Sequence, residues 1–402
     1  MLLLLVICYI LIYFYYRLFY EYTPFLTHTK NILFDSDTNE RIFTFQTHQR
    51  HLLHHIISSF FNKFFYKFLD PFYSAKLNSA IMGVSASLVI FFISRKLSLN
   101  YFISVLLFLS HALSATVLIF SSIPESFMTS AFMTNLLVLF YLCFDVKKIK
   151  YCIILGVVVA ASCFASAHHL LTMGFTFLYI FFKNFRNHKF YIEHSLIFLI
   201  TCLLSILLPI VLYSIFIPND YVGFFWHLRH QLGFYCLPAL AQSNAWKSVL
   251  VNFFLFSISP PDWPLTTSGD IAMKSFIAYF TQLPGLGFII TYGMLLAISI
   301  KKIYDYRHVC HDVLPVYILG LTYLVFFVPF YSSAAFTFSS FVIFFPICLI
   351  AKGISFMKSR LIYFILSLFV IFISINNTIF LRSIRDHIVL QRYKIIEMEC
   401  AR

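Results

Sequence analysis

Residues 34–69 read FDSDTNERIFTFQTHQRHLLHHIISSFFNKFFYKFL. From Leu52 onward, apolar pairs recur every four residues, at 52/53, 56/57, 60/61, 64/65 and 68/69, with polar or amphipathic pairs between them. A helix with this pattern is too polar on one face to span a bilayer and suits the membrane surface. Because the repeat is four rather than 3.6 residues, the apolar stripe drifts by about 40° per repeat, and we expect a bend or break partway.

Outside this stretch, apolar runs of membrane-spanning length dominate the chain. The 402 residues are 60% hydrophobic and 11% charged, with a mean hydropathy of +0.86, whereas soluble domains carry about 25% charged residues. The sequence predicts an all-α, polytopic membrane protein with eleven transmembrane helices and with interfacial helices in two large outer loops. The apolar runs lie near 1–19, 76–94, 101–121, 125–144, 151–166, 167–182, 194–217, 275–300, 313–331, 335–351 and 361–380.

The basic residues predict the orientation of these spans. They gather in alternate connections, which the positive-inside rule places in the cytoplasm together with the N-terminus. The long loops 21–75 and 218–272 then lie outside. One feature disagrees, because eleven spans also put the tail outside. The connection residues are Arg95/Lys96, Lys147/Lys148/Lys150, Lys183/Arg186/Lys189, Lys301/Lys302/Arg307 and Lys352/Lys358/Arg360, and the tail carries Arg382, Arg385, Arg392 and Lys394.

The chain forms one membrane domain over 1–402 in the simplest account, since no internal repeat or low-complexity linker interrupts it. It divides into a helical module at 1–217, the second outer loop at 218–272, further spans at 273–380 and a polar tail at 381–402. In the second loop we expect two short helices and a Pro-rich turn. The net charge of +13 follows from the orientation of the spans, and no nucleic-acid partner is indicated.

The first loop holds acids beside a basic cluster. The acids are Asp35, Asp37 and Glu40, followed by Arg50, His51, His54 and His55. His51, His54 and His55 share one side of a helix, and arginine offers a fork for phosphate, so this face suits phosphate binding. The alternatives are an Asx-rich turn for the acids and lipid-headgroup contact for the basic face. Catalytic zinc would want three well-placed ligands, and we predict no metal site.

Four further polar residues are candidates for substrate binding. Glu125 opens a span directly after Pro124, where capping of the helix is the alternative role. Ionisable groups at membrane depth are costly and often functional, which selects His168 and His169 unless their junction is a surface turn. The fourth candidate is Arg229 in the second loop. His111, alone in mid-span, is predicted to be a hydrogen-bonded packing residue, and the sequon at 376–378 lies inside a predicted span, so we expect no glycosylation there.

The order of these pieces resembles the GT-C superfamily of integral-membrane glycosyltransferases, including bacterial relatives similar to protein O-mannosyltransferases. A span is followed by an acid-bearing outer loop, the His-rich segment RHLLHHIISSFF, the turn IPESFMTSAFM, the segment ASCFASAHHLL, a second large loop and a late polar break, VPFYSSAAFTFSSF. The resemblance covers roughly residues 1–351. The late break departs from the family form, which often has a charged or basic residue there.

The resemblance implies a polyprenyl-phosphate sugar as donor and transfer of the sugar on the outer face of a bacterial cytoplasmic membrane. Asp37 or Asp35 would then act as the general base, with membrane lipids as the surroundings. No Gly-rich nucleotide cradle is present, which fits a lipid-linked donor, and no cofactor is indicated. The alternatives are a lipid-linked oligosaccharide polymerase or ligase, and a flippase or secondary transporter, against which the scarcity of mid-span charges counts.

Overall fold

The computed structural model describes residues 2–20, 64, 68–124, 127–165, 169–184, 191–216, 241–261, 279–310, 313–331, 339–357 and 359–400. Helices and short connections account for all of these residues, and no strand occurs among them. The all-α fold predicted from the sequence is confirmed for this part of the chain. In chain order the helices are α1 (Leu2–Arg17), α5 (Pro71–Lys96), α6 (Tyr101–Ala112), α7 (Ala115–Ser122), α8 (Phe127–Cys143), α9 (Ile149–Ala165), α10 (His169–Asn184), α11 (Tyr191–Phe216), α13 (Ser243–Val251), the π-helix η4 (Asn252–Phe256), α15 (Leu283–Asp305), the 3₁₀ turn η5 (Arg307–Val309), α16 (Leu314–Tyr331), α18 (Phe344–Ser355) and α19 (Arg360–Cys400).

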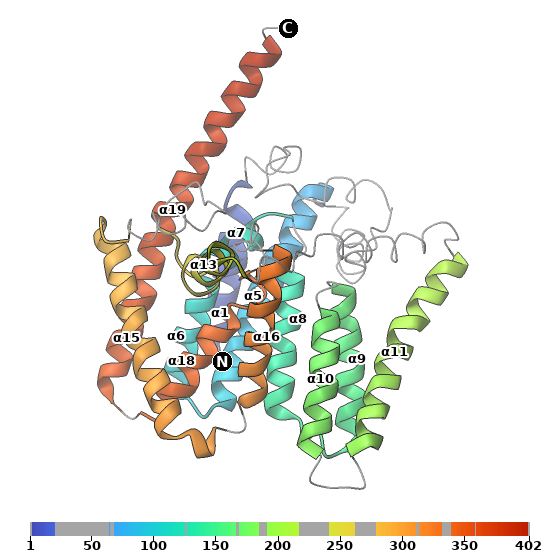
Figure 1. Cartoon of the computed structure of the whole chain (residues 1–402). Helices are drawn as coiled ribbons and strands as arrows, with labels where there is room; N and C mark the ends of the chain where they lie inside the picture. The colour runs from blue at the N-terminus through green and yellow to red at the C-terminus, as the bar shows by residue number, and fades with distance from the viewer. Residues whose placement is uncertain are drawn as a thin grey trace.

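The long helices stand side by side and run between the two ends of one bundle (Figure 1). One end carries the C-terminal turns of α5, α10 and α15, and we call it the basic end. These turns hold Arg95 and Lys96, Lys183, and Lys302, respectively. The grouping agrees with the alternation of basic connections in the sequence, which predicts that this end faces the cytoplasm.

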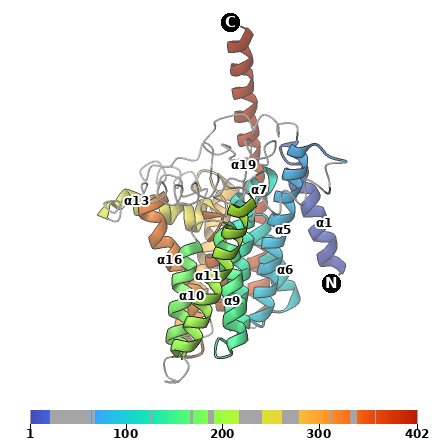
Figure 2. The same cartoon turned by 90° about the vertical axis from the view of Figure 1, so that its right-hand side faces the viewer.

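The opposite end, which we call the loop end, holds the last turn of α1, the first turn of α5 and the helix α13. Helix α13 is seen end-on in Figure 1 and lengthwise in Figure 2, so it lies across the bundle axis. This orientation fits a helix of the second loop that lies in the membrane surface, as predicted. Helix α19 continues past the loop end, and the chain terminates beyond the bundle (Figure 1).

The predicted surface helix at 51–69 falls largely outside the described residues, which include only Phe64, Phe68 and Leu69 of it. Its predicted bend and its place on the membrane stay predictions.

Three helical segments are long and apolar enough to cross a membrane: Tyr73–Lys96, Leu283–Asp305 and Arg360–Asp386. The bent pair α6–α7 would be a fourth. Each predicted span overlaps one helix or, at 101–121, two, but several of those helices have only 12–17 residues. At 1.5 Å per residue they cover less than the roughly 30 Å of a hydrocarbon core. The structure therefore has helices that fit a multi-pass membrane protein, and the number eleven stays a prediction.

The outer surface of the bundle is apolar where a lipid environment would require it. Helix α11 exposes Ile200, Leu204, Leu207 and Leu208, which recur at helical spacing on one side. Its opposite side packs on α9 and α10. Such a face is costly in water and suits contact with acyl chains.

The predicted span at 101–121 is not one straight helix, because α6 and α7 meet at an angle of 62°. The Ser114 hydroxyl donates a hydrogen bond of 2.6 Å to the His111 carbonyl oxygen. A serine that bonds to the preceding turn competes with the helical ladder and bends helices. All eight residues of α7 are buried, so the bent segment lies inside the protein.

Helices α15 and α18 approach each other closely at Gly353. A Cβ atom on Gly353 would lie 2.2 Å from the Ser299 Cα atom, which is backbone and cannot rotate away. We expect Gly353→Ala to lower the free energy of unfolding by about 1–3 kcal/mol through overpacking.

The matched control for this substitution is Gly293→Ala on α15, where no heavy atom lies within 4 Å of the added Cβ. There alanine should be neutral or should stabilise the helix by up to about 1 kcal/mol. Thermal unfolding in detergent compares the two variants. Equal melting temperatures would contradict the close packing of α15 on α18.

Candidate anion-binding cavity

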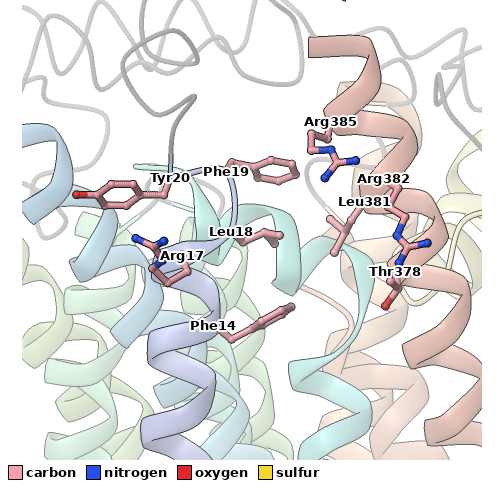
Figure 3. A pocket seen from close by; sticks show the side chains of 9 residues that line it. All are labelled: Phe14, Arg17, Leu18, Phe19, Tyr20, Thr378, Leu381, Arg382 and Arg385. Atoms are coloured by element: carbon pink, nitrogen blue, oxygen red, sulfur yellow. The ribbon is translucent and has the colours of Figure 1, made fainter. Parts of the chain in front are cut away.

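The last turn of α1 ends in a strained residue. The Leu18 amide donates to the Phe14 carbonyl oxygen at 2.9 Å, and Phe19 then adopts a φ of 56°. This left-handed conformation is usual for glycine at a helix C-terminus and costs other residues roughly 1–2 kcal/mol. Phe19 is only 6% exposed, so burial of its ring offsets that cost. The turn directs the ring toward α19 (Figure 3).

A cavity of about 430 Å³ lies between this turn and α19 (Figure 3). On α19, the lining residues 378, 381, 382 and 385 recur at helical spacing and so share one face. The nine lining residues are Phe14, Arg17, Leu18, Phe19, Tyr20, Thr378, Leu381, Arg382 and Arg385.

Three of the nine lining residues are arginines, and none is an acid. Figure 3 shows the Arg385 side chain directed toward Phe19 across the cavity, with Arg382 one turn below it. The Arg17 guanidinium lies on the far side of α1, where its Cζ atom is 4.9 Å from the centre of the Tyr20 ring. Arg382 and Arg385 line the cavity from α19, and Arg17 belongs to its opposite wall on α1.

The acid nearest in sequence is Asp386, whose Oδ1 atom lies 3.5 Å from Arg385 Nη2. The two side chains are 71% and 57% exposed, respectively. Exposed pairs of this kind contribute about 0–1 kcal/mol, so the pair leaves Arg385 able to bind another anion. No hydrogen bond or ion pair holds the Arg382 side chain within the described part of the chain.

A buried lysine holds the α1 turn from behind. Lys76 of α5 is fully buried, and its Nζ atom donates to the Leu18 carbonyl oxygen at 2.5 Å. Carbonyl groups at a helix C-terminus lack helical partners and accept such bonds from side chains. Tyr20 lies near this lysine and stacks on Tyr73, with ring centres 4.5 Å apart. The end of α1 is thus anchored to α5 beside the cavity.

The lining combines apolar rings and chains with guanidinium groups, which suits an amphiphilic anion. Phe14, Leu18, Phe19 and Leu381 can contact an acyl or prenyl chain. Arg382 and Arg385 can bind a phosphate, because the planar guanidinium donates two parallel hydrogen bonds to its oxygens.

Sequence patterns alone do not select the arginines of this cavity as candidate site residues. A signal for two of them was present, since Arg382 and Arg385 belong to the tail whose charge disagrees with the positive-inside rule. Both residues line the cavity from α19. Arg17 carried no such signal, because a basic residue at the end of a span is ordinary.

Among the residues selected from the sequence, the structure describes only His169. The others lie outside the described residues, so their positions stay predictions. They are Asp35, Asp37, Glu40, Arg50, His51, His54, His55, Glu125, His168 and Arg229.

His169 begins α10 and is 1% exposed. Its Nδ1 atom is hydrogen-bonded to the Tyr323 hydroxyl at 3.0 Å, and that hydroxyl is also bonded to the Thr172 hydroxyl at 2.8 Å. The Nε2 atom is buried and has no hydrogen-bond partner in the described structure. The structure does not bring His169 to the arginine cavity, because α10 and α19 lie on different sides of the bundle (Figure 1).

His111 behaves differently, and the prediction that it is a hydrogen-bonded packing residue is confirmed. Its Nδ1 atom lies 2.9 Å from Ser87 Oγ, and its Nε2 atom lies 3.3 Å from Asn135 Nδ2. Because the Ser87 hydroxyl donates to the Gly83 carbonyl oxygen, the histidine fits as a neutral ring that donates through Nδ1. Both ring nitrogens are then satisfied.

No group of three histidine, cysteine or acidic residues in the described ranges could hold a metal ion. Comparisons with known protein families, curated proteins and solved structures gave no match for this chain.

Proposed function

We propose that this protein is a membrane glycosyltransferase that uses a polyprenyl-phosphate sugar as donor and binds the donor phosphate in the cavity between α1 and α19. The single observation that carries the proposal is a cavity with apolar walls that Arg382 and Arg385 line from α19, with Arg17 among its lining residues on α1. A polyprenyl phosphate has the matching chemistry, with one anionic group attached to a long apolar chain. The cavity also lies at the loop end, beside the start of the acid-bearing first loop.

The arginines have a defined role in such a reaction. When the sugar carbon is attacked, the bond to the donor oxygen breaks and the polyprenyl phosphate leaves with additional negative charge. Guanidinium groups placed at that oxygen stabilise the charge as it develops. The acceptor hydroxyl loses its proton to a carboxylate, for which Asp37 and Asp35 are the candidates from the sequence.

A polymerase or ligase of lipid-linked oligosaccharides is the second candidate, since it also needs cations for a lipid phosphate or diphosphate. The arginine cavity suits both functions. The acids of the first loop favour the glycosyltransferase, because deprotonation of an acceptor hydroxyl calls for a carboxylate.

The bent segment α6–α7 could suggest a secondary transporter, but its hydrogen bonds count against that function. In transporters, interrupted helices use their free backbone groups to bind ions or substrates. Here the amides of Ala115 and Thr116 donate to the Ile258 and Ser257 carbonyl oxygens at 2.9 and 3.1 Å. The protein's own chain therefore occupies these groups.

The direct test reconstitutes the purified full chain in liposomes with a panel of polyprenyl-phosphate sugars and a membrane extract that supplies acceptors. Mass spectrometry then follows the release of free polyprenyl phosphate. We expect release from at least one monophosphate donor. Consumption of diphosphate-linked oligosaccharides alone would favour the polymerase or ligase. Movement of the intact lipid between leaflets without release of polyprenyl phosphate would mean that the protein is a flippase and not a glycosyltransferase.

A further inference from the structure

The bend between α6 and α7 gives two neighbouring carbonyl groups hydrogen-bond partners other than the amides of a continuous helix. In such a helix the Ala112 and Leu113 oxygens would accept from the amides of residues 116 and 117. The Thr116 amide instead donates to the Ser257 carbonyl oxygen, 3.1 Å away. The Ala112 oxygen therefore lacks its helical partner, and the Leu113 oxygen also accepts from another part of the chain.

These two carbonyl groups bind the two walls of the arginine cavity. The Tyr15 hydroxyl of α1 donates to the Ala112 oxygen at 2.6 Å, and the Asn377 Nδ2 atom of α19 donates to the Leu113 oxygen at 2.7 Å. Tyr15 and Asn377 are both fully buried. Each is the sequence neighbour of a cavity residue, Phe14 on α1 and Thr378 on α19.

A segment of the second loop joins the same junction. Asn377 Nδ2 also donates to the Ile258 oxygen at 2.8 Å, and Asn376 Nδ2 donates to Ser259 Oγ and to the Pro260 oxygen, both at 2.8 Å. Four hydrogen bonds from two adjacent side chains fix both the height and the rotation of α19. Rotation matters because one residue corresponds to about 100° around a helix, which would turn Arg382 and Arg385 away from α1.

We propose that the α6–α7 bend is the common anchor that sets the separation of the two cavity walls, and that Tyr15 and Asn377 are positioning residues for the anionic ligand. The positioning role in ligand binding rests on the proposed function. The anchoring role concerns only the coupling of α1 to α19 through the bend. Each role is tested by its own measurement.

The test uses Tyr15→Phe and Asn377→Leu, each with a control that removes a similar buried hydrogen bond elsewhere. Tyr141→Phe removes a hydroxyl bonded to Thr176 at 2.5 Å, and Thr172→Val removes a hydroxyl bonded to the Tyr323 hydroxyl at 2.8 Å. All four variants should lose thermal stability by similar amounts. Only Tyr15→Phe and Asn377→Leu should weaken the binding of polyprenyl phosphate in nanodiscs, by about tenfold for a lost hydrogen bond.

Hydrogen–deuterium exchange measures the wall coupling without any ligand. Asn377→Leu should accelerate exchange at the amides of residues 15–19 on the opposite wall, and Thr172→Val should not. Unchanged exchange there would refute the anchor, whatever the ligand. If the parent binds polyprenyl phosphate and both test variants bind as tightly as their controls, the positioning role is wrong and the proposed function stands. If the parent does not bind it while the exchange result holds, the proposed function is wrong and the anchor stands.

Discussion

Replacing Asp37 by asparagine is expected to lower the turnover of sugar transfer by about 10²–10⁴-fold, the usual contribution of a general base. Asparagine keeps the size of the side chain and much of its hydrogen bonding but cannot take a proton from an acceptor hydroxyl. The rate of polyprenyl phosphate release from liposomes, with donor and acceptor in excess, measures this effect. Binding of the donor should change little, because the proposed site for its phosphate is the arginine cavity.

Asp35→Asn separates the two candidate bases, since only one of the pair should show the large loss. Asp305→Asn is the control, because Asp305 is an exposed acid at the C-terminal end of α15, at the basic end of the bundle. If both single variants and the double variant kept near-normal transfer, the base would have to be sought outside this pair. Glu40 would then be the next acid to replace.

Replacing Arg382 and Arg385 together by glutamine is expected to weaken the binding of polyprenyl phosphate by about 100-fold or more. A hydrogen bond to a charged group contributes about 1.5–3 kcal/mol, and about 1.4 kcal/mol corresponds to tenfold in affinity. Glutamine keeps a polar amide at the end of a shorter side chain but carries no charge. Binding in nanodiscs of neutral lipid, measured at constant ionic strength, gives the comparison.

The control for this pair is Arg360→Gln, which removes an exposed arginine from the opposite end of the same helix. Two further measurements address the mechanism. Lysine at 382 and 385 should recover only part of the affinity, because the ammonium group lacks the planar fork. Binding should also weaken with salt, since the Debye length falls from about 30 Å at 0.01 M to about 3 Å at 1 M ionic strength. Equal affinities for the Arg382/Arg385 variant and the Arg360 control would show that the phosphate does not bind in this cavity.

The positions of the helices were predictable because the physical cause is local. A run of about 20 apolar residues between polar connections needs internal backbone hydrogen bonding in a membrane, and a helix supplies it. Helices α8, α9, α10, α16 and α18 accordingly lie where apolar runs occur. The two short runs around His168 are separate helices, α9 and α10. Alternation of Lys and Arg likewise predicted which connections share an end of the bundle.

The bend between α6 and α7 was not predictable, because the run at 101–121 contains neither proline nor glycine. Besides the local bond from the Ser114 hydroxyl to the His111 oxygen, partners from elsewhere in the chain stabilise the bend. Tyr15, Ser257 and Asn377 occupy backbone groups that a straight helix would have paired internally. Such competition between local and distant hydrogen bonds is decided only when the segments are packed together.

The sequence by itself therefore determined the all-helical class, the membrane character, the places of the helices and the grouping of basic residues at one end. Only the tertiary structure decided which polar residues meet. Asn376 and Asn377 had the form of a glycosylation sequon, yet their side chains hold α19 to the bend and to the second loop. Arg17 and Arg385 come from opposite ends of the chain and line one cavity. The hydropathy of a segment depends on neighbours along the chain. A binding cavity depends on neighbours in space, and no local sequence pattern encodes which residues those are.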